Sequence, residues 1–492
     1  MIGILAQSIA IPTIFSIIAL AVGKKLREKT GWIALIPLAY STAVLAYVNL
    51  LILSGRRAVE ESYYWSPLIG RVTLLADGLS APIALTIALL SAAVCIYSIE
   101  YMKEERTLEL YFALYLLYAA GMLGTVLSTN LAAFFLFFEM MLIPSWALIG
   151  IWGTGLRELI AYKYFMFTEA GALCLLAGIA SAYSISGTLD IMELAEKTAG
   201  VDTAILLAIA IAMLIGLFVK MAIVPLHSWL PDAHAEAPTP ISALLSPAMI
   251  GIGGYATIRI LYTAFPRVLQ VWEFDTALSI LALITMVYGG FMALAQTDIK
   301  RLLAYSSISQ MGYMLFGASS LSPLGILGAV LLYVSHGLAK AVLFMVSGVF
   351  MHEFETRNIE ELRGLASVMP FVAVASLVAF LCLAGVPPML GFWAEILVFA
   401  GSIHTALAGS IDTVRLSVTV LAIIASIITA GYGLWTVKRV FYGEPVERAR
   451  EAKRLSLLMA IPIAVLVVLA VVLGVYPTPL TKIVAAAGTT IP

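Results

Sequence analysis

The sequence is dominated by apolar stretches of about 20 residues, separated by short polar loops. A stretch of this length and composition is what a helix needs to cross the hydrocarbon core of a bilayer. Of the 492 residues, 62% are hydrophobic and only 12% are charged. Soluble domains have about half apolar and a quarter charged residues, so no water-soluble core can hide this surface. The stretches do not alternate, which excludes a transmembrane β-barrel. We therefore expect an all-α polytopic membrane protein.

Apolar windows predict fourteen membrane helices with short connections. The N-terminal stretch has no basic region or cleavage site, so we expect it to be a retained helix and not a signal peptide. The predicted helices lie near 2–22, 32–54, 73–97, 108–128, 131–152, 159–183, 203–224, 238–265, 274–296, 302–320, 323–351, 370–405, 415–441 and 454–474.

The charges of the loops predict the orientation. Loops after odd-numbered helices carry 18 of the 28 Lys and Arg residues, and the opposite side carries 8. Lys and Arg are enriched in cytoplasmic loops, so we expect the odd loops in the cytoplasm and both termini outside an inner or plasma membrane. The two remaining basic residues, Lys220 and Lys340, fall inside apolar segments.

Carboxylates join these lysines inside the predicted spans. A charge at the bilayer centre costs about 2.5–3.5 kcal/mol on insertion scales, so such residues must face protein or water, usually with a partner. Glu139 lies eight residues after Leu131, about 12 Å into the core. Its own helix offers no partner, so Lys220 is the expected one. The pair either takes part in ion transport or is a static salt bridge that holds two helices together. Glu169 faces either the same interior or another subunit.

The segment after Lys220 is rich in proline, which lacks the N–H that an α-helix needs. We expect a discontinuous helix here, with His227, Asp232 and His234 near the break, as in transporter pathways. Alternatively the two histidines are polar caps on a loop at the membrane edge. No soft-ligand cluster accompanies them, so no metal site is predicted. The prolines are Pro225, Pro231, Pro238 and Pro240.

Segment 370–405 repeats this pattern. As one straight helix it would be about 54 Å long, too long for the bilayer. Pro387 and Pro388 supply a break, and Glu395 follows it. Two broken helices at corresponding places indicate an inverted repeat.

Segment 323–351 places His336 and Lys340 four residues apart, on one helix face. A histidine near its normal pKa relays protons, although a lone buried histidine is more often a core group. Ser306 and Ser307, on the preceding predicted helix, either hold ordered water or pack between helices.

Four motifs carry a resemblance to a known family: FFEMMLIPSW, VKMAIVPLHSWLPDAHAEAPTPISALL, QTDIKRLLAYSSISQMGYM and HGLAKAVLFM. They resemble the antiporter-like subunits of respiratory complex I, of Mrp-type sodium/proton antiporters and of energy-converting hydrogenases, over roughly residues 70–440. The length favours a member like chain M of complex I or like the D-type subunit of Mrp antiporters. The resemblance implies two inverted five-helix repeats, at 101–265 and 266–445, between N-terminal helices at 1–100 and a last helix at 446–492.

The resemblance also implies roles for residues. Glu139 matches the family's glutamate on helix 5, Lys220 the lysine on helix 7, and Lys340 the lysine of the HxxxK motif, with His336 as its histidine. Glu395 matches the ionisable position on helix 12. Many relatives carry a lysine on helix 8, where this sequence has Gly251, in SPAMIGIGGYATIR. Either water fills the space that glycine leaves, or the relay is interrupted.

Together these observations predict a proton- or sodium-translocating subunit of a larger membrane complex. The chain has no Rossmann fingerprint, P-loop, haem ligand or iron–sulfur ligand set, so we expect no cofactor in it. Energy would come from partners: small antiporter-type subunits and a redox module, within the lipid bilayer. The alternatives are a non-pumping scaffold of the same kind of complex and a quinone-binding redox subunit.

Overall fold

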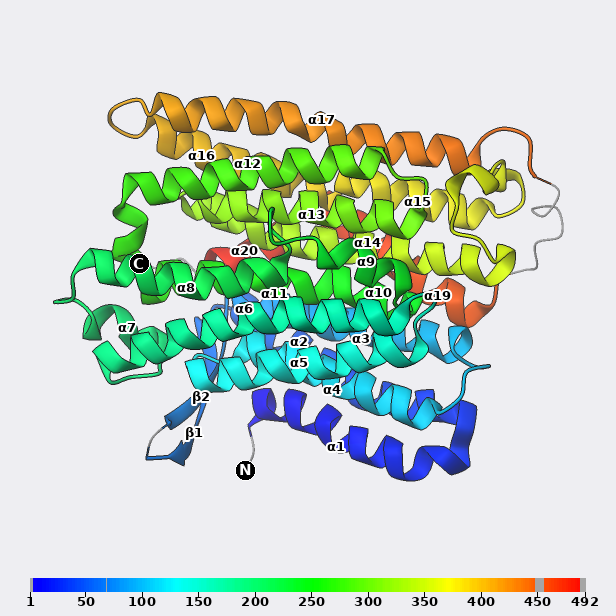
Figure 1. The fold of residues 1–492 in the computed structure, drawn as a ribbon, viewed down its shortest axis with the longest axis horizontal. Helices are drawn as coiled ribbons and strands as arrows, with labels where there is room; N and C mark the ends of the chain where they lie inside the picture. The colour runs from blue at the N-terminus through cyan, green and yellow to red at the C-terminus, as the bar shows by residue number, and fades with distance from the viewer. Residues whose placement is uncertain (1–2, 68, 447–454, 487–492) are drawn as a thin grey trace.

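The computed structural model describes residues 3–67, 69–446 and 455–486 and shows a bundle of long helices that run roughly along one direction (Figure 1). Twelve described stretches are long and apolar enough to cross a membrane. One of them, Ile4–Leu53, contains two helices joined by a short 3-10 turn. The helical membrane fold is confirmed, and the number fourteen stays a prediction.

The helices fall into a long and a short set. The long helices are α1 (Ile4–Leu26), α2 (Thr30–Leu53), α3 (Ser80–Tyr101), α4 (Leu108–Leu127), α5 (Leu131–Trp152), α6 (Arg157–Ser186), α8 (Thr203–Met221), α12 (Trp272–Leu294), α13 (Ile299–Ala318), α14 (Pro323–Phe354), α16 (Leu390–Leu407), α17 (Thr413–Phe441) and α19 (Leu457–Val475). The short helices are α7 (Ile191–Lys197), α9 (Trp229–Glu236), α10 (Thr239–Leu244), α11 (Ile250–Arg259), α15 (Pro370–Leu383) and α20 (Thr478–Ala485).

The expected helix near 73–97 is wrong at its start. Residues Ala58–Ser66 (β1) and Gly70–Asp77 (β2) pair as an antiparallel hairpin, and α3 begins only at Ser80. The apolar run of β2 resembles the start of a helix in a hydropathy window, but it is the buried part of a strand. The hairpin has a structural use: the Glu61 carboxylate accepts from the backbone N–H groups of Leu5 and Ala6 at 2.8 and 2.9 Å, which satisfies donors at the start of α1.

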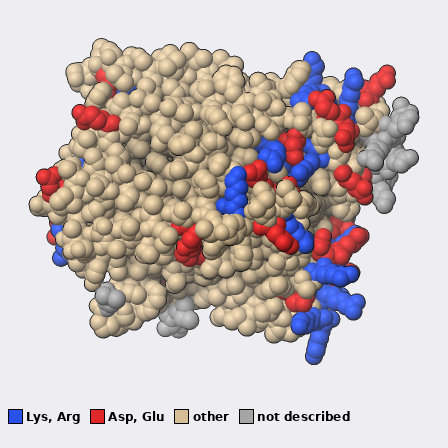
Figure 2. All heavy atoms as spheres, viewed as in Figure 1, with Lys and Arg blue, Asp and Glu red and all other residues tan. Residues whose placement is uncertain are grey.

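Charge is distributed as a membrane requires. On the face shown in Figure 2, the middle is almost free of charged residues, while Lys, Arg, Asp and Glu gather at the right end. Large apolar side chains are exposed on the outer helices, such as Ile17 on α1 and Ile427 on α17. In contrast, α14 is enclosed by α3, α10, α13, α15, α16 and α19. A helix that is buried all round is where polar side chains can meet without contacting lipid.

Two backbone bridges repeat one pattern at two places in the chain. In the first, Leu131 N–H donates to Leu189 O and Ile191 N–H to Thr129 O. In the second, Ile299 N–H donates to Arg357 O and Ile359 N–H to Thr297 O. The central pairs are Asn130 with Asp190 and Asp298 with Asn358, so both residues of the second bridge lie 168 positions after their counterparts (130 to 298, 190 to 358). In each bridge the first residue is the N-cap of a long helix.

Candidate functional site

The first broken helix lies where the prolines predicted it. Helix α8 ends at Met221, Ala222 takes a left-handed conformation with φ of 57°, and α9 begins at Trp229. The indole N–H of Trp229 donates to Val219 O at 2.9 Å, a carbonyl near the end of α8 that also accepts from the backbone N–H of Ala222. Pro225 lies in the break. Pro231, expected as a breaker, instead lies in the first turn of α9, where a missing N–H costs little.

Lys220 lies in the last turn of α8 and is 1% exposed. Its ammonium nitrogen stands 5.1 Å from the centroid of the Phe138 ring and has no hydrogen-bond partner among the described residues. Its charged neighbours are Glu139 on α5 and Glu169 on α6. Within the described part of the chain, neither carboxylate contacts the ammonium as an ion pair. The expected partners are thus adjacent but not in contact, and Glu139 Oε1 is also without a hydrogen bond there.

Lys340 lies at the centre of the bundle on α14 and is fully buried. Its Nζ donates to Leu303 O at 2.8 Å and to Ser306 Oγ at 2.6 Å. The Ser306 hydroxyl in turn donates to the Tyr432 hydroxyl on α17 at 2.8 Å. Ser306 therefore bonds directly to the lysine, whereas Ser307 pairs with Ser246 Oγ at 2.7 Å and packs between helices.

Two histidines lie beside Lys340. His336, one turn before it on α14, is buried and its Nε2 has no partner among the described residues. His234, from α9, stacks on Phe344 with ring centroids 4.7 Å apart, and neither ring nitrogen is hydrogen-bonded within the described chain. The charged and titratable neighbours of His234 are Lys300, Lys340 and His336. The first broken helix thus brings a histidine to the central lysine, and His234 is not a cap at the membrane edge.

The second break separates α15 from α16 and contains Pro387 and Pro388. Gln310 Nε2 donates to Leu383 O, the last carbonyl of α15, at 3.3 Å. Glu395, in the first turns of α16, is 8% exposed, and its Oε1 has no partner among the described residues. Gly385, with φ of 63°, lies against this carboxylate: a Cβ there would come within 2.5 Å of Glu395 Oε2. A side chain at position 385 would have to displace this carboxylate, in a backbone conformation that L-residues rarely adopt.

Two buried tyrosines lie near Glu395, and one of them is hydrogen-bonded to the serine that Lys340 contacts. Tyr432, which accepts from Ser306, and Tyr313 on α13 both have Glu395 as a charged neighbour. The Tyr313 hydroxyl shares a hydrogen bond with Thr429 Oγ1 at 3.3 Å. Sequence reasoning missed both tyrosines, because a tyrosine in an apolar helix is indistinguishable from a packing residue until its hydroxyl has a partner.

Gly251 does not leave open space. A Cβ at this position would come within 2.6 Å of the Tyr333 ring, so that ring from α14 lies directly against the glycine. The Tyr333 hydroxyl donates to Ala248 O at 2.9 Å, in a π-helical turn at Leu245–Met249 that precedes α11. The expectation of a water-filled gap beside the glycine is wrong, because a side chain occupies the place.

Asp232 belongs to a separate cluster near the charged end. Its carboxylate pairs with Lys163 at 2.6 Å and with Arg301 at 2.8 Å, all three being partly exposed. Lys300, which the sequence placed in a loop, is instead 3% exposed and donates to Ala237 O at 2.6 Å and Ala235 O at 3.4 Å at the end of α9. His227 packs edge-on against Tyr288, at 4.7 Å between ring centroids.

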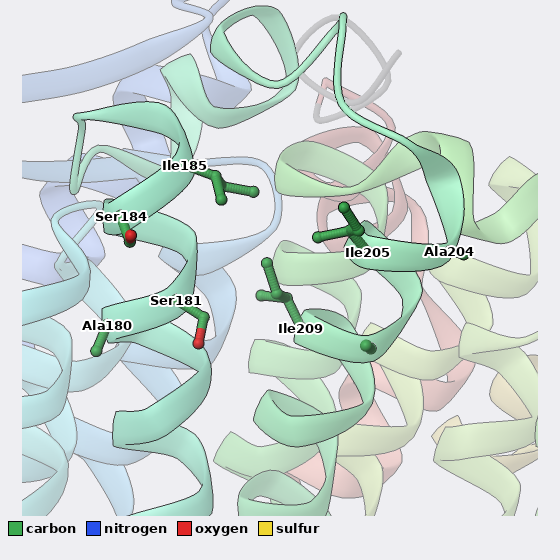
Figure 3. Close-up of a pocket in the computed structure, with 8 residues that line it drawn as sticks. Ala180, Ser181, Ser184, Ile185, Ala204, Ile205 and Ile209 are labelled. Carbon is green, nitrogen blue, oxygen red and sulfur yellow. The ribbon is translucent and has the colours of Figure 1, made fainter.

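A groove between α6 and α8 carries no ionisable group (Figure 3). Its volume is about 700 Å³, and it is lined by Ala180, Ser181, Ser184, Ile185, Ala204, Ile205, Ala208 and Ile209. Such a lining suits acyl chains and not an ion. The groove is thus separate from the ionisable groups at Lys220, Lys340 and Glu395.

A helical membrane bundle with two broken helices and buried lysines between them defines an antiporter-like membrane subunit. The family model described as "NADH:quinone oxidoreductase/Mrp antiporter, TM" matches residues 128–429, and "NADH-Ubiquinone oxidoreductase (complex I), chain 5 N-terminus" matches residues 68–112. The chain belongs to the NADH:quinone oxidoreductase/Mrp antiporter family.

Curated relatives agree. The chain is 30% identical over 489 residues to F(420)H(2) dehydrogenase subunit M of Methanosarcina mazei, covering 97% of this chain and 96% of that protein. It is 35% identical over 418 residues to an NAD(P)H-quinone oxidoreductase chain 4 of Synechococcus, covering 84% of this chain and 78% of the relative.

Solved structures share the fold. A chain of the Mrp complex from Dietzia superposes with a TM-score of 0.89 at 24% identity, covering 100% of this chain and 98% of that one. A chain of respiratory complex I from Thermus thermophilus gives 0.86 at 25% identity and covers 100% of both chains. The protein is thus a multi-pass plasma-membrane subunit of the kind found in Mrp, complex I and related assemblies, with other membrane subunits as its partners.

Proposed function

We propose that this subunit moves protons or sodium ions across the membrane along a row of groups inside the helix bundle: the partly buried Glu139 and the buried Lys220, His336, Lys340 and Glu395. The observation that carries the proposal is Lys220, a buried ammonium with two carboxylates nearby and no ion pair to either among the described residues. A structural salt bridge would need direct contact to offset the cost of burial. A group that must change its charge benefits instead from neighbours that can approach and withdraw.

The second half of the row has a similar design. Lys340 is buried, and the acceptors of its two hydrogen bonds are neutral oxygens, Leu303 O and Ser306 Oγ. Neutral acceptors tolerate both the charged and the uncharged amine, whereas a carboxylate in contact would favour the charged form. Ser306 and Tyr432 continue from Lys340 toward Glu395, so a proton has donors and acceptors along this part.

The internal symmetry of the family supports two transport units in one chain. The matching bridges at Asn130 and Asp298 recur with one offset, and a broken helix follows each bridge. In the expected order of spans, five crossings separate the two bridges, so in this proposal they lie at opposite membrane faces. This supports inverted repeats at about 101–265 and 266–445. The loop charges support cytoplasmic odd loops and both termini outside.

The energy source in this proposal lies in the partner subunits: a redox module or another subunit's ion gradient, with small antiporter-type subunits beside this one. The relative in Methanosarcina mazei is named as a subunit of a dehydrogenase, and the Dietzia structure is of an Mrp complex. Both contexts fit a membrane subunit that receives its driving force from neighbours.

The test is ion flux in proteoliposomes that contain the purified whole complex. Lys220→Ala should abolish flux, because it removes the ammonium between Glu139 and Glu169. Lys197→Ala, at an exposed lysine on α7, is the matched control and should leave flux unchanged. Wild-type flux in Lys220→Ala would refute the proposal. Glu139→Gln separates it from a scaffold role, which predicts altered assembly with normal flux.

A further inference from the structure

A small pocket lies at the C-terminal end of α17, against the 3-10 turn Ile359–Glu361. Its volume is about 360 Å³, which is within the range of ligand pockets, about 300–1,000 Å³. None of the groups of the proposed ion path lines it. Its described lining contains three cationic side chains and one carboxylate, namely Arg363, Lys438, Arg439 and Glu360.

One of the three cations has a counter-charge within the described chain. Arg439 forms an ion pair with Glu360. Lys438 and Arg363 are exposed, and neither has an ion pair among the described residues. The guanidinium of Arg363 lies against the turn after α17, because a Cβ at Gly443, where φ is 98°, would stand 2.7 Å from Arg363 Nε. Two unpaired cations at one pocket create a positive potential that attracts an anion.

The pocket lies at the level of lipid headgroups. Ile427, at the midpoint of α17, is exposed, as expected for a side chain that faces acyl chains. Lys438 follows it by about 16 Å along the helix, and half of the hydrocarbon core is about 15 Å thick. The exposed rings of Trp435 and Tyr442 also line the pocket, with the Lys438 ammonium 5.5 Å from the centroid of the Trp435 ring. Tryptophan and tyrosine are enriched where a membrane meets water.

We propose that this pocket binds the phosphate group of an anionic phospholipid, with Arg363 and Lys438 as its cationic ligands. Basic pockets at the membrane boundary recognise such headgroups, and a guanidinium matches the geometry of phosphate oxygens. The occupant is a lipid and not free phosphate, because exposed apolar side chains of α17, such as Leu434 and Ile427, continue from the pocket toward the membrane interior. A lipid meets both the charge and this apolar surface, whereas free phosphate meets the charge alone. The inference goes beyond the proposed function.

The test measures the affinity of the purified full-length protein for phosphatidylglycerol and for phosphatidylcholine by native mass spectrometry. The wild type should bind phosphatidylglycerol more tightly than phosphatidylcholine. Arg363→Ala combined with Lys438→Ala should weaken phosphatidylglycerol binding by about 25-fold, because each Lys or Arg at a membrane surface strengthens the attraction of anionic lipid by about fivefold. Binding of phosphatidylcholine and the unfolding midpoint should stay unchanged, since both side chains are exposed and unpaired in the described chain.

Two further variants separate a built site from general surface charge. Lys24→Ala combined with Lys25→Ala removes the same charge from the last turn of α1, which finishes at the same end of the bundle as α17 (Figure 1). Neither lysine lines the pocket, so phosphatidylglycerol affinity should stay close to that of the wild type. Glu360→Gln removes the carboxylate that pairs with Arg439 and frees that charge, so it should tighten phosphatidylglycerol binding by about fivefold.

Three outcomes overturn the lipid site. Equal weakening in the α1 variant and the pocket variant would show that binding follows general surface charge. Displacement of phosphatidylglycerol by inorganic phosphate, at a concentration that leaves the α1 variant and wild type equally charged toward other lipids, would show that the pocket takes a free anion. Unchanged phosphatidylglycerol binding in the pocket variant, with or without loss of a partner subunit from the purified complex, would show that lipid is not the occupant.

Discussion

Asp77 and Arg259, 182 residues apart in the chain, form a two-bonded ion pair in the interior, with Arg259 Nη2 at 2.7 Å from Asp77 Oδ1 and Nη1 at 2.9 Å from Oδ2. Neither side chain is more than 2% exposed. Asp77 Oδ1 also accepts from the backbone N–H of Ser80 at 2.9 Å, and Tyr255 lies against Arg259. The pair ties the end of the hairpin to the end of α11.

Breaking this pair from one side should be costly. Asp77→Asn leaves a buried guanidinium without its counter-charge, and we expect a loss of about 3–5 kcal/mol in the free energy of unfolding. The double variant Asp77→Asn with Arg259→Gln should lower the free energy of unfolding by less than the sum of the losses in the two single variants. The measurement is unfolding of the purified protein in detergent. As a control, Glu100→Gln breaks a partly exposed pair with Lys103 and should cost at most about 1 kcal/mol. Equal losses in Asp77→Asn and the control would contradict this account.

Acid should weaken the same contact. Burial alone would raise the pKa of the Asp77 carboxyl, but the adjacent Arg259 guanidinium outweighs burial and lowers that pKa to about 2, from 3.8. A group with a lowered folded pKa stabilises the fold above its unfolded pKa, and this stability is lost as the pH falls from about 4 toward 2. The loss amounts to about 2 kcal/mol. Unfolding midpoints measured across this range should fall more steeply in the wild type than in Asp77→Asn. Parallel curves would rule out the assignment.

The Asp232 cluster should behave differently because water reaches it. Lys163 and Arg301 are more than a third exposed on their side chains, and Asp232 is 23% exposed. Pairs of this kind contribute at most about 1 kcal/mol and are screened by salt. We expect Asp232→Asn to differ from wild type in unfolding midpoint at low salt, with the difference shrinking at about 1 M salt. A difference that persists at high salt would show that the cluster acts through buried hydrogen bonds.

Ser306 and Ser307 allow a matched comparison within one helix. Ser306→Ala removes one of the two hydrogen-bond acceptors of Lys340 and the hydrogen bond to Tyr432. We expect a loss of about 1.5–3 kcal/mol, the range for hydrogen bonds to charged groups, together with reduced ion flux. Ser307→Ala removes the contact with Ser246 and a hydrogen bond to Leu303 O, but no hydrogen bond to Lys340, and should keep flux. Equal ion flux in the two variants would mean that Ser306 is not part of the ion path.

The sequence alone predicted the features that depend on composition and on local chain geometry. Apolar length located the helices, and clustered prolines predicted the breaks after Lys220 and before Glu395. Lys220 and Lys340 stood out because a charge inside an apolar window has no cheap structural explanation. His336 followed from its spacing to Lys340 on one helix.

The predictions that failed concern features that depend on contacts between distant segments of the chain. The run in β2 is as apolar as a helix start, and only its pairing with β1 makes it a strand. Pro231 looks like a breaker when prolines are simply counted, yet its effect depends on its place within a turn. Nothing near Gly251 in the chain indicates that Tyr333, 82 positions later, would fill the space beside it. The contacts of Lys300 and Tyr432 are likewise visible only from their neighbours in space.

The short helix α9 has a mechanical consequence. Its C-terminal carbonyls accept from Lys300 and Arg357, and Arg301 pairs with its Asp232; all three cations come from the later part of the chain. His234 on the same helix touches Phe344 near the central lysine. This one short segment therefore joins α13, by hydrogen bonds and an ion pair, to the imidazole that stacks on α14 near Lys340.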